Sequence, residues 1–253
     1  MFKRAIWKNL ALTAIGIGLL VCVWVVAWVA VGNEYVVPAF SDCVKKLAKL
    51  LFTDAGFWRA FLHTFLRVLQ AFVWSVALAM LVATLGYVFP AVERVFAPVV
   101  VFLRSAPVMA VLLIILVWTN AGVAPVIVAF LSLFPTLYAG VFGAISAVDK
   151  ELVEMSRVYN VPVRKRIAKL YLPTIAPFFA REAGAALGFG IKLVVSAEIL
   201  VRTRASLGIL MQDAQIFGEM PTLFALVIVA CAFGFLCDCL GGGVARLFER
   251  RGK

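Results

Sequence analysis

Charged side chains inside long apolar segments are the residues of this chain best placed to do chemistry. The apolar stretch 173–201 holds Lys192 and Glu198, and a central charge in a membrane span costs about 2.5 to 3.5 kcal/mol unless it faces a cavity or a partner. Arg202 follows Glu198 by four residues, the favourable order for a helical ion pair. No acidic residue lies three or four positions from Lys192. We therefore expect Lys192 to meet a counter-ion from another helix, or an anion in an aqueous path.

A second polar interruption lies in the apolar stretch 95–118, which contains Arg104, Ser105 and Pro107. Proline removes a backbone donor, and irregular backbone at membrane depth is tolerated only within protein or beside a water-filled cavity. This pattern predicts a segment that lines a path through the membrane. An elbow at the membrane surface, with Arg104 reaching lipid headgroups, is the open alternative. The candidate path residues are Arg104, Ser105, Pro107, Lys192 and Glu198.

The sequence gives little support for catalysis or metal binding. His63 is the single histidine, and Cys237 and Cys239 have no further cysteine or histidine near them. Metal and acid–base sites need several such groups together. No G-x-x-x-x-G-K-[ST] motif occurs, so the chain cannot hold ATP phosphates with a P-loop. We expect no catalytic residue, no metal and no cofactor bound by this chain, which argues against a membrane enzyme.

Composition identifies an integral membrane protein. Of the 253 residues, 64% are hydrophobic, whereas soluble domains are about half apolar. The net charge of +11 would suggest nucleic-acid binding in a soluble protein, but here the basic residues flank apolar segments, so no nucleic-acid partner is expected. We predict an all-α membrane protein in which residues 1–253 form a single transmembrane domain with six helices. The predicted spans, each long enough for a hydrocarbon core of about 30 Å, are 10–32, 61–89, 95–118, 123–148, 173–201 and 221–248.

The distribution of basic residues predicts the topology. Lysine and arginine concentrate before residue 10, in the loop 149–172 and at the C-terminal end, and such loops face the cytoplasm. Both termini and the loop 149–172 are therefore expected in the cytoplasm. Residues 41–51, on the outer side, have the pattern of an amphipathic helix. Gly184 and Gly188 have the small-xxx-small spacing that lets two helices pack closely.

The loop 149–172 alternates charged and apolar side chains as a helix surface does, and it breaks at Asn160-Val161-Pro162. It resembles the cytoplasmic EAA loop of ABC-importer permeases, in which Glu-Ala-Ala is followed by a turn glycine and then by Leu-Pro. Here Glu154 is followed by Met155 and Ser156 in place of the alanines, and Asn160 replaces the glycine; asparagine tolerates the left-handed conformation. The resemblance assigns coupling to an ATPase to Glu151, Glu154, Met155, Ser156, Tyr159, Asn160, Val161, Pro162, Leu172 and Pro173.

The resemblance extends from about residue 37 to residue 214. The segments FLRSAPVMAVLL, LFPTLYAGVFGAISAVDKELVEMSR and VVSAEILVRTRASLGILM are similar to permeases of the nitrate, sulfonate, taurine and bicarbonate importers. This implies a type I ABC-importer transmembrane domain in a prokaryotic inner membrane, surrounded by lipid and paired as a homodimer. It also implies cytoplasmic ATPase subunits, which bind ATP and Mg²⁺, and an extracytoplasmic substrate-binding protein. Lys192 stands where family members carry an uncharged or aromatic residue, so no substrate is transferred from them.

The expected function is the permease subunit of an ATP-driven importer for a small solute, anionic if Lys192 meets it. An uncharged vitamin precursor, carried by the same machinery, is an open alternative. An ion-coupled secondary carrier is a further alternative, although it predicts an internal repeat and paired intramembrane acids, and neither is clear in the sequence.

Overall fold

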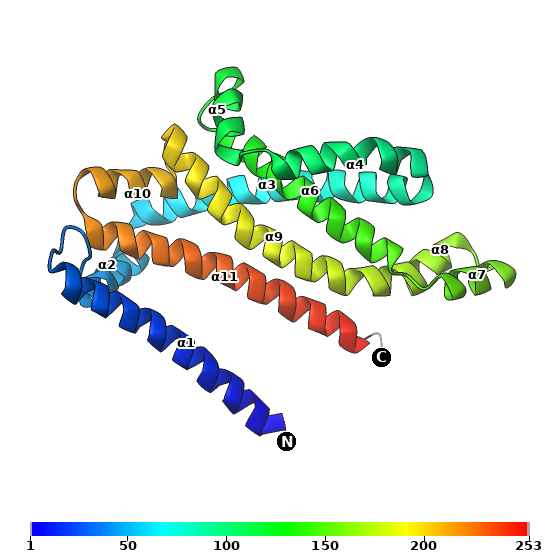
Figure 1. The fold of residues 1–253 in the computed structure, drawn as a ribbon, viewed down its shortest axis with the longest axis horizontal. Coiled ribbons are helices and arrows are strands. Elements are labelled where there is room, and N and C mark those ends of the chain that lie inside the picture. Colours follow the sequence, from blue (N-terminus) through cyan, green and yellow to red (C-terminus); the bar gives the residue numbers. More distant parts are fainter. Residues whose placement is uncertain (1, 252–253) are drawn as a thin grey trace. The chain divides into compact units, whose positions relative to one another are not determined.

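The computed structural model describes the backbone of residues 2–251 and the side chains of residues 15, 16 and 18–248. Every regular element in this range is helical (Figure 1), which confirms the all-α prediction. The elements are α1 (Phe2–Val31), α2 (Phe40–Thr53), α3 (Ala55–Val88), α4 (Pro90–Ser105), α5 (Val108–Trp118), α6 (Ala124–Ser146), α7 (Lys150–Val158), α8 (Val163–Arg166), the π-helical turn η1 (Ile167–Tyr171), α9 (Leu172–Val201), α10 (Leu207–Ile216) and α11 (Met220–Arg251).

Within the described residues, four helices are long and apolar enough to cross a membrane, or five if one bent pair counts as a span. The four are Ala55–Val88, Ala124–Ser146, Val163–Val201 and Met220–Phe248. The predicted first span, 10–32, falls in α1, where only Gly18–Val31 registers as a shorter apolar helix. Its earlier side chains lie outside the described set, so the predicted count of six is not reached.

The chain divides into two compact units, one made of residues 1–58 and 210–229 and the other of residues 59–209 and 230–253. In the first unit, the indole of Trp24 donates to the Pro38 carbonyl oxygen at 3.1 Å. Its ring also packs against Phe40 and Phe224, with centroids 5.8 and 5.0 Å apart. These contacts attach α1 to α2, the amphipathic helix that the sequence predicted.

The core of the second unit lies where α5, α6 and α9 meet. Leu112 and Ile115 of α5, Val128 of α6, and Ala197 and Val201 of α9 form one buried apolar cluster. Small and β-branched residues allow α6 and α9 to lie side by side along most of their lengths (Figure 1). As a result, α9 is buried on most of its surface and exposes one narrow face. That face determines where charged residues of α9 can meet a ligand.

The predicted third span, 95–118, is not a single helix. It consists of α4 and α5, which meet at an angle of 100° across Ala106 and Pro107. Ala106 is extended, with φ −66° and ψ 133°, because the proline that follows it disfavours the helical conformation. The pair is therefore a broken span or a re-entrant segment rather than a straight crossing.

The boundary between the loop 149–172 and the predicted span 173–201 does not coincide with a helix end in the structure. Helix continues from Val163 to Val201 through η1, so the second half of the charged loop and the predicted fifth span form one rod. A proline inside a regular α-helix clashes with the carbonyl four residues back. The wider π turn immediately before Pro173 relieves that clash. The Leu172-Pro173 pair therefore changes the local hydrogen-bond pattern without ending the helix.

Helices α9 and α11 cross at glycines. A Cβ atom built on Gly184 would lie 2.6 Å from the Gly241 Cα atom, and one built on Gly188 would lie 2.8 Å from the Gly234 carbonyl oxygen. The two backbones therefore touch at both levels. Because Gly184 pairs with Gly241 and Gly188 with Gly234, the two helices run antiparallel.

Candidate functional site

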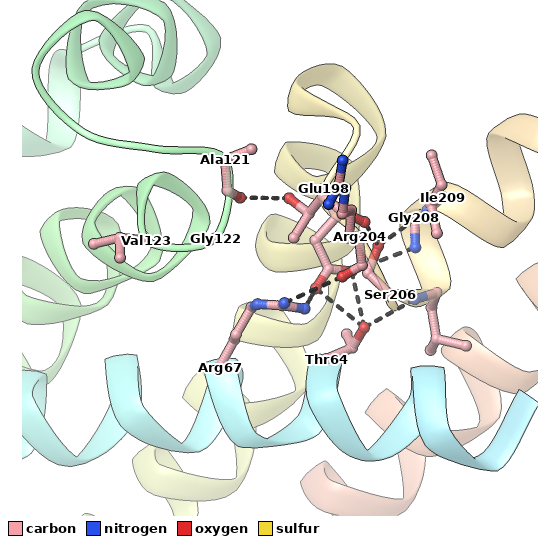
Figure 2. A network of polar contacts seen from close by, with 12 residues as sticks. Thr64, Arg67, Ala121, Gly122, Val123, Glu198, Arg204, Ser206, Gly208 and Ile209 are labelled. Carbon is pink, nitrogen blue, oxygen red and sulfur yellow. Dashed lines mark hydrogen bonds and ion pairs between the residues drawn. The ribbon is translucent and has the colours of Figure 1, made fainter. Parts of the chain in front are cut away.

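The carboxylate of Glu198 in the second unit belongs to a residue with no exposed surface. Arg67 Nη1 donates to Glu198 Oε1 at 2.8 Å, and the Thr64 hydroxyl lies 3.1 and 2.9 Å from the two carboxylate oxygens. The backbone N–H of Gly208 donates to Oε2 at 3.3 Å. Figure 2 shows these groups converging from α3 and from the start of α10. A buried charge is tolerated when it is paired and hydrogen-bonded in this way.

The loop between α9 and α10 closes around this carboxylate. Arg202 and Ala205 both have a φ of 49°, and these two left-handed residues fold the chain back onto α9. Arg67 Nη2 donates to the Arg204 carbonyl oxygen at 3.4 Å, and the Leu207 N–H donates to the Thr64 hydroxyl at 2.9 Å. Gly208 packs so closely that a Cβ atom there would lie 2.5 Å from the Glu198 Cβ atom. The network therefore holds this loop in one conformation.

The same loop is fixed to the turn between α5 and α6. Thr203 Oγ1 donates to the Ala121 carbonyl oxygen at 2.6 Å. Ser206 Oγ donates to the Thr203 carbonyl oxygen at 2.7 Å and accepts from the Ile209 N–H at 3.1 Å. One polar cluster thus joins α3, α9, α10 and the turn after α5. We call it the Glu198 network, made of Thr64, Arg67, Glu198, Thr203, Ser206 and Gly208.

The expected pairing of Glu198 with Arg202 is wrong. The carboxylate pairs with Arg67 instead, and Arg202 leaves the helix in the left-handed conformation, which removes it from the i+4 position of a regular helix. Glu198 was also assigned to the substrate path. In this conformation its carboxylate is enclosed by protein groups, so its direct contact with a solute stays a prediction.

Lys192 lies on the exposed face of α9. With Asp238 of α11, it lines a cavity of about 320 Å³ between these two helices. The floor is made by Gly188 and Gly234, where the backbones touch. No ion pair or hydrogen bond joins Lys192 to Asp238 in the described part of the chain. The other lining residues are Ala185, Phe189, Cys231 and Phe235.

The remaining predicted path residues gather at the break between α4 and α5. Arg104, Ser105 and Pro107 are all exposed, and the Ser105 hydroxyl donates to the Val101 carbonyl oxygen at 2.9 Å. The structure does not bring them into the cavity that Lys192 lines. The residues of the path predicted from sequence therefore lie in three separate places of the second unit: the break between α4 and α5, the cavity that Lys192 lines, and the buried Glu198 network.

The charged loop folds as a helix, a turn and a second helix. Asp149 caps α7 by accepting from the Glu151 N–H at 2.9 Å, a favourable N-cap arrangement. Asn160 has a φ of 51°, and the Val161 N–H donates to the Ser156 carbonyl oxygen at 2.9 Å. This is the left-handed helix end that glycine usually supplies. Pro162 is the N-cap residue that precedes α8.

The surface of α7 carries exposed apolar side chains. Val153 and Ser156 are buried, whereas Glu151 and Glu154 are exposed. Leu152, Met155 and Tyr159 are spaced so that they share one face of the helix, and Tyr159 is 76% exposed. An exposed apolar strip beside charged residues is typical of a protein-binding surface. The coupling residues predicted at the far end, Leu172 and Pro173, are exposed and lie where α9 begins.

Several residues of these sites were not singled out from the sequence. Thr64 and Arg67 lie one turn apart in an apolar stretch, a polar pair whose spacing was a usable signal. Gly208 carried no signal, because its role depends on contact with Glu198 across a fold of the chain. Asp238 is the most informative omission. Its position near the end of an apolar segment gave no indication that it faces the same cavity as Lys192.

Comparisons with known proteins agree with this architecture. The family model described as binding-protein-dependent transport system inner membrane component matches residues 75–252. A Brucella melitensis protein assigned as an ABC transporter permease is 28% identical over 236 residues, covering 92% of this chain and 95% of that protein. The Bacillus subtilis protein SsuC, assigned to aliphatic sulfonates transport as a permease, is 25% identical over 98% of this chain and 88% of its own length.

A solved structure of the methionine ABC transporter MetNI, in inward-facing conformations, contains a chain with the same fold. It superposes with a TM-score of 0.61 at 18% sequence identity, covering 76% of this chain and 93% of that chain. At this identity the likeness concerns the fold alone. It shows the type I ABC-importer transmembrane fold.

Proposed function

The chain belongs to the family of binding-protein-dependent transport system inner membrane components and is an ABC-importer permease; on this premise we propose that it carries a small anionic solute. The solute is handed over by an extracytoplasmic binding protein and moved by ATP hydrolysis on separate subunits. The feature that most strongly supports ATP-driven transport is the surface of α7 and α8 at the end of the continuous helix Val163–Val201. Two copies of the chain would form the complete path.

The coupling step is proposed to occur at α7. Its exposed Leu152, Met155 and Tyr159 would pack in a groove of the ATPase, with Glu154 facing a cation at the rim. Because helix is continuous from Val163 through α9, movement of α7 and α8 would reach the membrane segment without a flexible joint. The permease would then alternate between inward-open and outward-open states.

The side assignment is part of this proposal. The loop that contains α7 and α8 is basic, and the positive-inside bias favours its placement in the cytoplasm together with both termini. The Glu198 network would then lie at the outer end of the spans. That is the side on which a binding protein would deliver the solute.

Reconstitution with the ATPase and the binding protein tests coupling. We expect Glu154→Lys to lower both transport and binding-protein-stimulated ATP hydrolysis by at least about tenfold, the effect of losing roughly 1.4 kcal/mol at an interface. Glu34→Lys makes the same charge change at an exposed position outside the loop and should leave both rates unchanged. Equal rates for Glu154→Lys and the unaltered protein would refute docking through α7.

Lys192 provides the test of the anionic solute. Replacement by methionine keeps the stem length and removes the charge, so transport of an anion should fall while the basal ATP hydrolysis persists. Normal transport by Lys192→Met would make the residue structural and would favour an uncharged cargo. Transport that continues without any ATPase would instead identify an ion-coupled carrier.

A further inference from the structure

The cavity between α9 and α11 presents one cationic and one anionic side chain. Lys192 and Asp238 line it from opposite helices, and both are exposed to it. We propose that this cavity binds a small zwitterion, with the anionic end of the ligand at Lys192 and its ammonium group at Asp238. The inference rests on the proposed function, because it narrows the solute of the importer from an anion to a molecule that carries both charges.

Membrane energetics argue that water or solute covers this face. An ionised lysine or aspartate inside a span is unfavourable in contact with lipid, so such residues face a partner or a water-filled cavity. Lys192 lies nine residues before the end of α9 at Val201, and Asp238 lies 13 residues before the end of α11 at Arg251. Neither is joined to another side chain by an ion pair in the described part of the chain. Two such residues at one hollow therefore indicate a hydrated cavity, where a polar ligand can reach both.

The register of the two helices separates the charges. Gly188 and Gly234 touch, and Lys192 and Asp238 each lie four residues beyond this crossing along their own antiparallel helices. At a rise of about 1.5 Å per residue, their backbones are about 12 Å apart along the helix axes. The flexible lysine stem shortens the gap between the charges. The remaining space suits a molecule whose two charges are joined by a short carbon chain, rather than a direct ion pair.

The size and walls of the cavity also fit a small organic ligand. Its volume of about 320 Å³ is at the lower end of the range for small-molecule sites, about 300 to 1,000 Å³. Gly188 and Gly234 keep the floor open. Phe189 and Phe235 form apolar walls, and an aromatic face also attracts an ammonium group. A carbon spacer between two charged ends would lie against these rings.

The cavity contains its own reporter, because the exposed Cys231 lines it. The experiment uses the full chain in complex with its ATPase, with the other four cysteines replaced by alanine. The rate of maleimide labelling at Cys231 is measured with four probes that share one skeleton: taurine, β-alanine, ethanesulfonate and ethylamine. Taurine and β-alanine carry both charges, whereas each of the other two carries one.

Zwitterionic probes are expected to slow labelling of Cys231 at concentrations about tenfold lower than single-charge probes, because each charge-assisted contact adds to affinity. Taurine and β-alanine distinguish a sulfonate from a carboxylate at the anionic end. Asp238→Asn should bring taurine to the level of ethanesulfonate. Lys192→Met should bring it to the level of ethylamine. Lys45→Met, at an exposed residue of α2, is the matched control and should leave every probe unchanged.

A monodisperse complex with an unaltered melting temperature shows that each variant is folded. Equal protection by ethanesulfonate and taurine in the unaltered protein would overturn the proposal, as would absence of protection by either zwitterion. Failure of the importer proposal looks different. In that case Cys231 would be protected by a zwitterion, while transport in the reconstituted system would not depend on ATP.

Discussion

Arg67 and Glu198 are separated by 131 residues in the sequence, and their side chains meet at 2.8 Å in the second unit. Glu198 is fully buried, and Thr64 and the Gly208 N–H hold its second oxygen. Loss of one partner of such a buried pair destabilises the folded protein, because the other charge is then left buried without compensation. The pair therefore fixes α3 to α9 and keeps the loop 202–206 closed over the end of α9.

Removal of one partner of this pair should destabilise the protein strongly. Arg67→Met leaves the Glu198 carboxylate without its cation, a loss of about 3 to 5 kcal/mol. The double variant Arg67→Met/Glu198→Gln removes both charges and keeps a hydrogen-bonding side chain, so it should recover part of that loss. The free energy of unfolding in lipid nanodiscs, compared in a double-mutant cycle, measures the coupling.

The exposed pair of Asp42 and Lys45 supplies the control for this cycle. These side chains are 45% and 77% exposed, and such surface pairs contribute about 0 to 1 kcal/mol. Asp42→Asn should therefore change the free energy of unfolding little. A loss for Arg67→Met as small as the loss for Asp42→Asn would contradict the assigned role of the buried pair.

The glycines at the crossing of α9 and α11 allow a second comparison within one helix. Gly241→Ala places a Cβ atom 2.5 Å from the Gly184 Cα atom, whereas nothing lies within 4 Å of a Cβ atom at Gly242 or Gly243. A backbone contact cannot be relieved by rotating a side chain. Gly241→Ala should therefore destabilise the helix pair by about 1 to 3 kcal/mol.

Gly242→Ala and Gly243→Ala should be neutral, or stabilising by up to about 1 kcal/mol, because alanine favours the helix. Thermal unfolding of the three variants in the same detergent gives the comparison. A melting temperature for Gly241→Ala equal to those of its two neighbours would show that the backbones do not touch at this level.

Much of the fold could be predicted from the sequence because membrane spans are recognised by their length and their apolar composition. The helices at 55–88, 124–146, 172–201 and 220–251 each contain or closely match a predicted span. The segment 95–118 was predicted as an interrupted span, but hydropathy depends on composition and does not give the direction of the two halves. Pro107 signalled irregular backbone, but the angle of 100° depends on the packing of α4 and α5 against α6.

The parts of the sites that depend on residues close together in the sequence could be predicted. The turn at Asn160 follows from the tolerance of asparagine for a left-handed backbone, and the structure places it there. The partner of Glu198 was not local. A residue four positions away was preferred to Arg67, which becomes a neighbour only when α3 packs on α9. Asp238 was likewise missed because contacts between glycines set the register of α9 and α11. The sequence does not show which glycine of one helix meets which glycine of the other.

The left-handed residue in the charged loop leads to a local prediction. Asn160→Val puts a β-branched residue at a φ of 51°, which costs about 1 to 2 kcal/mol. The hydrogen bond from the Val161 N–H to the Ser156 carbonyl oxygen should open more often. Hydrogen exchange at the Val161 amide should be faster by about 5- to 30-fold.

Asn160→Gly should keep the slow exchange, because glycine adopts this conformation freely. Tyr159→Val introduces the same residue at an ordinary φ of −80° and should accelerate exchange far less. If both valine variants exchanged at the same rate, backbone strain at Asn160 would not be the cause.

The thiol of Cys43 gives a prediction for pH dependence. Cys43 of α2 is fully buried, and burial, with the Asp42 carboxylate beside it, raises the pKa of the thiol above its ordinary value. The folded chain thus holds this proton more tightly than the unfolded chain does. The stabilisation is complete below the ordinary thiol pKa of about 8.5 and decreases as the pH rises above it. Cys43→Ala should remove this part of the pH dependence of the melting temperature.

Labelling by a small maleimide measures the same property directly. With Cys43 as the single cysteine, labelling should stay slow from pH 7 to pH 9, because the thiolate is disfavoured and the sulfur is covered. Ser41→Cys in a chain without other cysteines places a thiol at an exposed position two residues away. It should react quickly and faster with each increase in pH. Labelling of Cys43 at the rate of this control, without denaturant, would show that α2 does not bury the thiol.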